Sequence, residues 1–361
     1  MPSPLDAADL RSRVQGAIDA ELSHQRAVLA EVGPQVAHLV DVVEALLTGG
    51  KRLRAAFLYW GYRASGHPDG DAIVRLAMSM ELFQAAALIH DDVMDDSDLR
   101  RGMPAAHRAL AGHHREHAWE GSADRFGLAG AVLAGNLCLT WADEAFATCG
   151  LPAEQVARGR STFDQMRTQL MAGQFLDVIE SVRPWDGLST SERIERASHV
   201  IRYKSAKYSI EQPLLIGAAA GGLDAGALAA LSRYGLALGH AFQLRDDVLG
   251  VFGDPSETGK PAGDDIREGK RTVLIAHALD RADALGRAEV SAALGREDLP
   301  EGTVARVRAV LVESGAAAAV ESEITSSAQQ ARAALESVAD LEPSARTVLA
   351  DLIDVTTSRS T

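Results

Sequence analysis

Two clusters of aspartates are the residues in this sequence that most clearly could do chemistry. In the first, Asp91 and Asp92 follow an apolar run that ends at Ile89, and Asp95 comes one helical turn after Asp91. Carboxylates four residues apart share a helix face, where they repel each other unless a cation holds them together. Oxygen ligands without cysteine suit a hard cation, and Mg²⁺ that also contacts substrate phosphates fits this set. The alternative interpretation is a solvated acidic helix end.

The second cluster repeats this design much later in the chain. Asp246 and Asp247 end another apolar helical run, shortly after Gln243. One acidic pair means little, but two pairs with the same apolar lead-in could face each other across a helical bundle. Such an arrangement would clamp several metal ions between them.

Basic residues near the clusters indicate a substrate that carries phosphate. Lys51 and Arg54 follow the pair Gly49-Gly50 at an expected helix start, a position that favours anions. Arg100 and Arg101 directly follow the first cluster. Further cations are Lys204, Lys207, Lys260 and Lys270. Each of these side chains alone reads as a solvated surface cation, but together they predict a cavity with acids on one wall and cations around a polyphosphate.

The composition excludes several classes of protein. The 361 residues carry a formal net charge of -14, which argues against nucleic-acid binding, because a phosphate backbone needs a stripe of lysine and arginine. Only Cys138 and Cys149 occur, so we expect a reducing compartment and no disulfide framework. The first twenty residues lack the apolar core of a signal peptide. The longest apolar run, 126–142, contains Asn136 and reads as a buried core helix. We therefore expect a cytoplasmic protein without a membrane span.

The elements that must position these groups are helices. Good helix formers fill most of the chain, and apolar residues recur at steps of three and four, as at Val40, Val43 and Leu47. We predict an all-α fold, a single-domain helical bundle around a central active-site cavity. The predicted domain spans residues 1–361, with a motif-bearing core at about 49–273 and C-terminal helices at 274–361.

In motif order, the chain resembles the trans-isoprenyl (polyprenyl) diphosphate synthases, most like the bacterial geranylgeranyl diphosphate synthases. The matching segments are Gly49-Gly50-Lys51-Arg52-Leu53-Arg54, Asp91-Asp92-Val93-Met94-Asp95, Arg100-Arg101-Gly102-Met103-Pro104, Gly173-Gln174 with Asp177, Lys204-Ser205-Ala206, Phe242-Gln243-Leu244-Arg245-Asp246-Asp247, Gly259-Lys260 and Gly269-Lys270-Arg271-Thr272. The resemblance implies the isoprenoid synthase type of fold, a homodimer, and condensation of an allylic diphosphate with isopentenyl diphosphate.

The resemblance also implies roles for individual residues. Three Mg²⁺ ions on the allylic diphosphate would be held by Asp91, Asp92, Asp95, Asp246 and Asp247. The same diphosphate would be bound by Arg100, Lys204 and Lys260, and isopentenyl diphosphate by Lys51, Arg54, Arg101 and Gln84. We count Lys270 among the substrate-binding cations. The allylic cation would be stabilised by backbone carbonyls near Lys204 and Ser205 and by the Gln243 side chain.

The chain departs from the family pattern at a few positions. Gly250 stands where many relatives have a third aspartate in the second cluster, and Asp254 lies too far along to replace it. Asn136 stands where an aspartate is usual. Ala55 for proline and Ser205 for threonine are milder changes. We expect Asn136 to be the main source of any functional difference.

The residues before Asp91 bear on product length. Farnesyl-specific relatives carry a bulky aromatic four or five positions earlier, where this chain has Ala87 and Ala86. Phe83, eight residues before Asp91, lies about 12 Å below it at 1.5 Å per residue, and either forms the cavity floor or is an ordinary core aromatic. The favoured product is geranylgeranyl diphosphate, with a longer chain as the alternative.

Two other functions fit parts of the pattern. A terpene cyclase would share the fold and the first cluster, but it needs no site for isopentenyl diphosphate. A non-catalytic partner subunit would typically lose one acidic cluster, and both are present. Two further patterns do not fit known sites: Glu116 is misplaced for a zinc protease helix among His113, His114 and His117, which we expect in a polar surface loop, and Pro261 breaks the nucleotide-loop pattern after Lys260.

Overall fold

The protein is built almost entirely from helices. The computed structural model describes residues 4–253, 263–296 and 298–358. Its elements are η1 (Pro4–Asp9), α1 (Leu10–Ala30), η2 (Pro34–Val36), α2 (Ala37–Leu47), α3 (Leu53–Arg63), α4 (Asp71–Met94), β1 (Leu99–Arg100), β2 (Met103–Pro104), α5 (Ala106–Glu116), α6 (Ala123–Ala147), α7 (Ala153–Val182), α8 (Thr190–Val200), η3 (Ile201–Glu211), α9 (Gln212–Ala220), α10 (Ala225–Phe252), α12 (Asp264–Arg267), α13 (Val273–Arg281), α14 (Ala284–Ala293), α15 (Glu301–Glu313), α16 (Ala316–Glu336) and α17 (Pro343–Thr357). The all-α prediction is confirmed.

The chain divides into two compact units. Unit 1 comprises residues 1–159 and 217–222, and unit 2 comprises 160–216 and 223–361. Helices α7 and α9 each begin in one unit and end in the other. The single-domain organisation stays a prediction.

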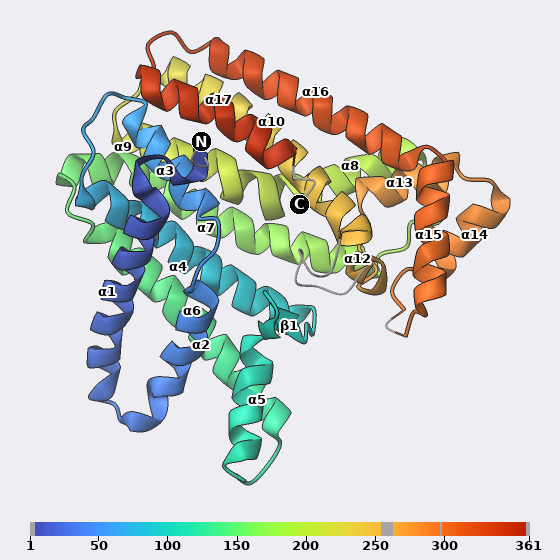
Figure 1. Ribbon diagram of the computed structural model, residues 1–361, viewed down its shortest axis with the longest axis horizontal. Helices are drawn as coiled ribbons and strands as arrows, with labels where there is room; N and C mark the ends of the chain where they lie inside the picture. The colour runs from blue at the N-terminus through green and yellow to red at the C-terminus, as the bar shows by residue number, and fades with distance from the viewer. Residues whose placement is uncertain (1–3, 254–262, 297, 359–361) are drawn as a thin grey trace. The chain divides into compact units, whose positions relative to one another are not determined.

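Unit 1 is organised around α4 (Figure 1). Helices α1, α3 and α6 pack against it, and α5 packs against α6. In α2, the apolar residues at steps of three and four face the core, since Val40, Val43 and Leu47 are all buried. By length and composition, α4 and α6 could each cross a membrane; 72% of the apolar window of α4 and 39% of that of α6 are buried. A core helix of a soluble protein meets the same criterion, so the absence of a span stays a prediction.

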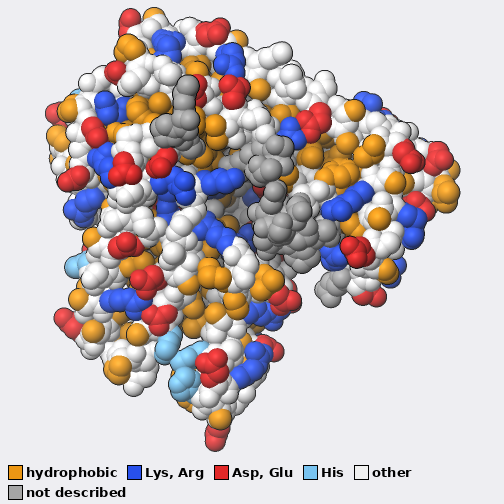
Figure 2. All heavy atoms as spheres, viewed as in Figure 1, with side chains coloured by type: hydrophobic (Ala, Val, Ile, Leu, Met, Phe, Trp, Pro, Cys, Tyr) orange, Lys and Arg blue, Asp and Glu red, His pale blue; other side chains and the backbone are white. Residues whose placement is uncertain are grey.

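Histidines gather where α2 meets α5 in unit 1 (Figure 2). The ring centroids of His38 and His113 are 3.7 Å apart, and those of His113 and His117 are 4.2 Å apart. His114 is buried, and its ring lies against Trp119. The expected polar surface loop is therefore wrong: this segment forms the helix α5, whose apolar positions pack it against α6.

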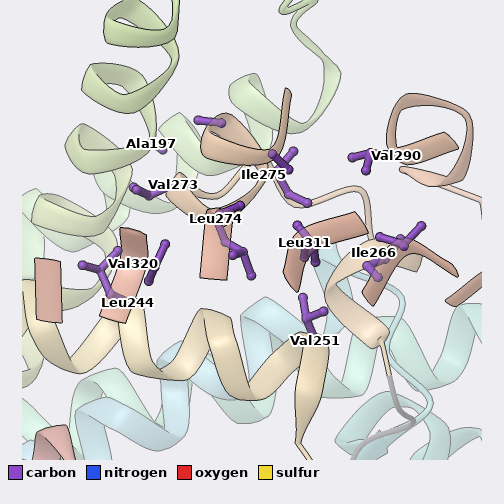
Figure 3. Close-up of a cluster of buried hydrophobic side chains, with 14 of the residues drawn as sticks. Ala197, Leu244, Val251, Ile266, Val273, Leu274, Ile275, Val290, Leu311 and Val320 are labelled. Atoms are coloured by element: carbon purple, nitrogen blue, oxygen red, sulfur yellow. The ribbon is translucent and has the colours of Figure 1, made fainter. Parts of the chain in front are cut away.

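Unit 2 is organised around α10. Helices α16 and α17 and the wide helix η3 pack against it, and α13 joins α8 and α16. Its apolar core combines residues of α10, α12, α13, α14, α15 and α16 (Figure 3). In this cluster Val251, near the end of α10, lies with Ile266 of the short helix α12 and Leu311 of α15. The apolar cluster thus fixes the end of α10, which carries the second acidic cluster.

Candidate active site

The first acidic cluster lies where α4 ends in unit 1. The backbone N–H of Asp95 donates to the carbonyl of Asp91 at 2.8 Å, and the N–H of Ser97 donates to the carbonyl of Asp92 at 3.0 Å. The following residue, Asp96, has a left-handed backbone with φ of 52°. The last turn of the helix therefore presents the three predicted metal-binding aspartates together, just before the chain turns away.

Arg100 binds the buried member of this cluster. The Asp92 side chain is 2% exposed, and its Oδ1 accepts a hydrogen bond from Nε of Arg100 at 2.9 Å and a second from its Nη2. The same guanidinium lies 4.0 Å from a carboxylate oxygen of Asp91. Because a buried carboxylate is costly without a partner, the pair with Arg100 compensates for the burial of Asp92.

A tight hairpin places Arg101 next to Arg100. Strands β1 and β2 pair Arg100 with Met103, and the two turn residues, Arg101 and Gly102, both have positive φ, 53° and 74°. Two consecutive left-handed residues match the twist of a two-residue hairpin. Nη1 of Arg101 donates to the carbonyl of Leu46 at 2.9 Å. A Cβ at Gly50 would approach that guanidinium to 3.1 Å, so the glycine allows the close contact.

Unit 1 therefore gathers guanidiniums around Arg101. Burial lowers the pKa of Arg101, and the charges of nearby arginines lower it further. Those neighbours are Arg52, Arg100 and Arg54. Arg52 is 3% exposed and pairs with Glu81 at 3.3 Å, so it serves the fold. The remaining concentration of like positive charge is a favourable environment for a polyphosphate anion.

The predicted substrate and chain-length residues lie further back along α4. Gln84, Ala87 and Asp91 are half-buried and follow one another at helical spacing, so they share one stripe of α4. Ala86 is fully buried, and Phe83 is 1% exposed. Burial of Phe83 is compatible with a cavity floor and with a core aromatic. Lys51, before α3, is exposed.

In unit 2, Lys204 and Ser205 lie in a π-helix, the eleven-residue segment η3. Wide π turns are frequent at functional sites because they shift backbone groups out of the α-helical pattern. Glycines of neighbouring helices let this helix pack closely. A Cβ at Gly173 of α7 would lie 2.7 Å from the backbone nitrogen of Lys204, and one at Gly239 of α10 would lie 2.6 Å from Cα of Ala206. Gly235 approaches Glu211 in the same way, with a Cβ distance of 2.6 Å to Cα.

Within unit 2, Lys204 is oriented by Asp177 of α7, whose Oδ2 lies 2.5 Å from the lysine Nζ. Both side chains are about a quarter exposed, at 22% and 25%. The pair therefore keeps an accessible cation at a fixed place, as a diphosphate-binding lysine requires. Ser205, next to it, is 7% exposed.

In the second acidic cluster, the described hydrogen-bond donor to buried Asp247 is an amide. Asp247 is 6% exposed, and its Oδ1 accepts a hydrogen bond from the Gln243 amide at 2.8 Å. Burial first, and then the nearby charges of Asp265 and Asp246, raise the pKa of Asp247 to about 8. Because Gln243 uses its amide nitrogen in this hydrogen bond, its amide oxygen can face another group. That oxygen is the atom expected to stabilise a carbocation.

Lys270 is committed to acidic neighbours. Its Nζ lies 3.0 Å from Oδ1 of Asp265 and 2.5 Å from Oε2 of Glu268. Burial opposes the charge of Lys270, but Asp265 and Glu268 raise its pKa well above the ordinary value. We did not predict Asp265 or Glu268 from the sequence. The signal that could have found Asp265 is the missing side chain at Gly250 followed by a second acidic pair shortly afterwards.

The remaining predicted positions lie outside the described residues or on the surface. Lys260, and with it Asp254 and Pro261, lies outside the described residues. Asn136 is exposed on α6. Among the described residues, no three acidic, histidine or cysteine side chains converge closely enough to hold a metal ion by themselves.

The donor set nevertheless fits magnesium. Mg²⁺ is usually held by one or two carboxylates together with substrate phosphates, so a complete protein cage is not needed. The second cluster supplies the structural sign of a cation site, because Asp247 is buried beside like charges that a divalent ion would relieve.

Comparison with known proteins agrees with this chemistry. A model of the family described as Polyprenyl synthetase matches residues 36–311. The geranylfarnesyl diphosphate synthase of Aeropyrum pernix is 31% identical over 86% of this chain and 91% of its own length, and the nonaprenyl diphosphate synthase of Mycobacterium tuberculosis is 29% identical over 96% and 92%.

A solved structure is similar over nearly the whole chain. It is a geranylgeranyl pyrophosphate synthase from Corynebacterium glutamicum, described as complexed with isoprenyl diphosphate and magnesium. It is 38% identical, with a TM-score of 0.91, and the alignment covers 97% of this chain and 98% of the other. With a family match across most of its length, relatives that are synthases and the same helical fold, this chain belongs to the polyprenyl synthetase family and is a trans-prenyltransferase of isoprenoid biosynthesis.

Proposed function

We propose that this enzyme joins an allylic diphosphate to isopentenyl diphosphate, head to tail, and that its main product is geranylgeranyl diphosphate. The observation that carries the proposal is the group of guanidiniums around Arg101, next to the first acidic cluster. A terpene cyclase needs one diphosphate site, whereas the accessible Lys51 and the Arg54 and Arg101 guanidiniums supply charge for a second diphosphate.

In this proposal the chain's own residues bind and orient the two diphosphates. Arg100 and Lys204, with Lys260, bind the allylic diphosphate, and Lys51, Arg54, Arg101 and Gln84 bind isopentenyl diphosphate, with Lys270 as a further cation near the second cluster. Three Mg²⁺ ions, held by Asp91, Asp92, Asp95, Asp246 and Asp247, would supply charge that stabilises the departing diphosphate. Asp177 keeps Lys204 in place, which lowers the cost of ordering that lysine during the reaction.

The reaction then needs protection of a carbocation. The allylic carbon–oxygen bond breaks, the double bond of isopentenyl diphosphate forms the new carbon–carbon bond, and a proton passes to the released diphosphate. The amide oxygen of Gln243 and the backbone carbonyls near Lys204 and Ser205 stabilise the positive charge. An apolar cavity excludes water, which would quench the cation.

The choice of product rests on the stripe below Asp91. Ala87 and Ala86 leave room for a growing chain, and Phe83, about two turns below Asp91, is buried as a floor should be. The relatives range from geranylgeranyl to nonaprenyl diphosphate synthases, so a longer product is the second candidate. Phe83→Ala should therefore lengthen the product by at least one five-carbon unit, and chromatography of the dephosphorylated products measures this.

The test of the proposed function is a condensation assay with the purified protein. It is incubated with Mg²⁺, labelled isopentenyl diphosphate and, separately, dimethylallyl, geranyl or farnesyl diphosphate. A main twenty-carbon alcohol supports the proposal. A longer main product supports the same reaction but shows that Phe83 is not the floor of the cavity. The matched control for Phe83→Ala is Phe57→Ala, which truncates another buried aromatic, on α3. Lack of condensation with every starter overturns the stand-alone synthase and favours a non-catalytic partner subunit.

Two further expectations belong to this proposal. We propose that the enzyme is cytoplasmic, in keeping with its two free, buried cysteines, Cys138 and Cys149. We also propose that it acts as a homodimer. Size-exclusion chromatography with light scattering measures the assembly, and a monomeric active enzyme would contradict it.

A further inference from the structure

A pocket opens within unit 2 at a place that the proposed reaction does not use. It has a volume of about 730 Å³, and its walls are formed by α8, η3, α10 and α16. Pockets that bind small molecules typically measure about 300–1,000 Å³. No described residue among those predicted to bind substrate or metal lines it. Along α10, the fully buried Leu244 lies between His240 of the pocket and Asp247.

Much of the lining is apolar. Buried and half-buried side chains from three helices contribute to it: Ile201, Ala206, Leu236, Ala237 and Ala334. Removing such a surface from water is favourable, and the gain grows roughly in proportion to the apolar area that is covered. This part of the pocket therefore favours a hydrocarbon chain.

Two arginines at the pocket have no acidic partner in the described part of the chain. Arg202 of η3 and Arg233 of α10 both line the pocket, and both are exposed. The guanidinium of Arg202 lies 6.0 Å from the ring centroid of Tyr203, and neither arginine forms an ion pair with a described carboxylate. Both can therefore bind an anion from solution.

The same two helices neutralise an arginine elsewhere. Where α10 and α16 meet near the second acidic cluster, Nη1 of Arg245 lies 2.6 Å from Oε1 of Glu321 on α16. The acid near His240, Glu323, is hydrogen-bonded to Nε2 of His277 at 2.6 Å. At the pocket, the polar residues that α16 contributes to the lining are uncharged: Ser327, Gln330 and Ser337. The positive charge there is thus left for a ligand.

The pocket borders the π-helix that carries Lys204. Arg202 and Ala206, two residues to either side of Lys204 in η3, both line it. Towards α10 this helix has little room to move, because a Cβ at Gly239 would lie 2.6 Å from Cα of Ala206. A molecule in the pocket therefore contacts the segment whose position determines where Lys204 lies.

We propose that this pocket binds an amphipathic anion, an apolar chain that ends in a phosphate or a carboxylate, and that the bound anion weakens binding of the allylic diphosphate. The chain covers the apolar lining, and the head group pairs with Arg202 and Arg233. Isoprenoid phosphates and fatty acids share this chemistry. The effect on the allylic diphosphate rests on the proposed function, because it acts through Lys204, whereas the binding site does not.

Binding is measured by isothermal titration calorimetry of the full-length protein with farnesyl monophosphate and, separately, with dodecanoate. We expect wild type to bind, and the tighter of the two ligands identifies the source. Arg233→Glu reverses one of the two charges and should weaken binding about tenfold. Ala237→Phe fills the apolar part of the pocket and should abolish binding. The matched control is Arg287→Glu, at an exposed arginine of α14 that does not line the pocket.

Two results would overturn the site. One is a wild type that binds neither ligand. The other is binding that Arg233→Glu and Ala237→Phe leave unchanged, since the ligand would then lie elsewhere, as in the substrate cavity. Thermal unfolding verifies that each variant is folded. If Ala237→Phe does not fold, Arg233→Glu decides, because its side chain is exposed.

The effect on the reaction is measured in condensation assays with and without dodecanoate. Because Asp177 orients Lys204 in the structure, a shift of η3 should weaken the allylic site. We expect the KM for the allylic diphosphate to rise about fivefold in wild type, the lower end of usual allosteric coupling, and to stay constant in Ala237→Phe.

The outcomes separate this inference from the proposed function. A rise in KM that Ala237→Phe retains would mean that dodecanoate competes in the substrate cavity, which overturns the coupling. A wild type that binds dodecanoate in the pocket but condenses no substrate overturns the proposed synthase and leaves the site in place. Binding and a rise in KM that both depend on Arg233 and Ala237 support both.

Discussion

The two acidic clusters look alike in sequence but differ in how the protein neutralises them. In unit 1, buried Asp92 is paired with Arg100, which also lies 4.0 Å from Asp91. In unit 2, buried Asp247 has an amide as its hydrogen-bond donor, and burial, together with the acids nearby, raises its pKa to about 8. The positive charge of Lys270 is divided between Asp265 and Glu268.

Similar acidic motifs can therefore have different partners in the folded protein, a guanidinium at Asp92 and an amide at Asp247. In the first cluster, a guanidinium of the protein itself contacts Asp92 and Asp91. In the second cluster, Asp247 is a buried acid beside other acids, and its negative charge is costly there. We infer that the second cluster gains more from metal binding than the first.

The largest expected effect is on condensation, where the two clusters should behave alike. Asp92→Asn and Asp247→Asn each remove a charge needed to stabilise the departing diphosphate. We expect each to lower kcat/KM by about 10²- to 10³-fold, the usual cost of losing one transition-state contact. Steady-state assays with labelled isopentenyl diphosphate measure this. Asp98→Asn, at an exposed acid paired with Arg108, is the control. A large loss in only one cluster would contradict a shared role.

The next effect should separate the clusters, because their stabilities should change in opposite directions. In the presence of EDTA, Asp92→Asn removes the carboxylate that contacts partly buried Arg100 most closely, and we expect a loss of about 2 kcal/mol. Asp247→Asn relieves a buried acid among like charges, and we expect a gain of about 1 kcal/mol. Urea unfolding at pH 7 measures both. Changes of the same sign would remove the electrostatic distinction drawn between the clusters.

The smallest effect is a pH dependence confined to the second cluster. With its pKa raised to about 8, Asp247 holds a proton in the folded protein at pH values where the unfolded chain, with a pKa of about 4, has lost it. Stability of the metal-free protein should therefore fall as pH rises from about 5 to 8.

The comparison that isolates this effect is wild type against Asp247→Asn, unfolded in urea with EDTA across that pH range. The difference between the two should grow with pH and level off above pH 8. A difference that is constant with pH would mean that Asp247 is ionised throughout. The metal should act in the opposite sense, since binding requires the ionised carboxylate and releases its proton.

Much of this architecture could be predicted from the sequence. Period and composition predict the helices, as in α2, and the apolar run before Asp91 predicts the helix that ends in the first cluster. The glycine pair before Lys51 correctly predicts a break before α3. These features are local, so a sequence carries them directly.

What the sequence could not predict depends on contacts between distant segments. Arg52 lies within a basic motif, yet it turns inward to Glu81, and nothing in the motif distinguishes it from Arg54. Asp265 reaches Gly250 only because α12 docks on α10. The π-helical form of η3 is equally hidden, since its residues read as ordinary helix formers.

The glycines that pack against η3 also determine which positions of unit 2 can tolerate a substitution. At Gly173, Gly235 and Gly239 even a methyl group would push on the π-helix, and at Gly173 the atoms it would meet are backbone atoms of Tyr203 and Lys204. Residues on the open side of the same helix, such as the exposed Arg202, carry no such constraint. Substitutions in unit 2 should therefore be tolerated better at the surface, and the shape of η3 is preserved by residues that have no side chain.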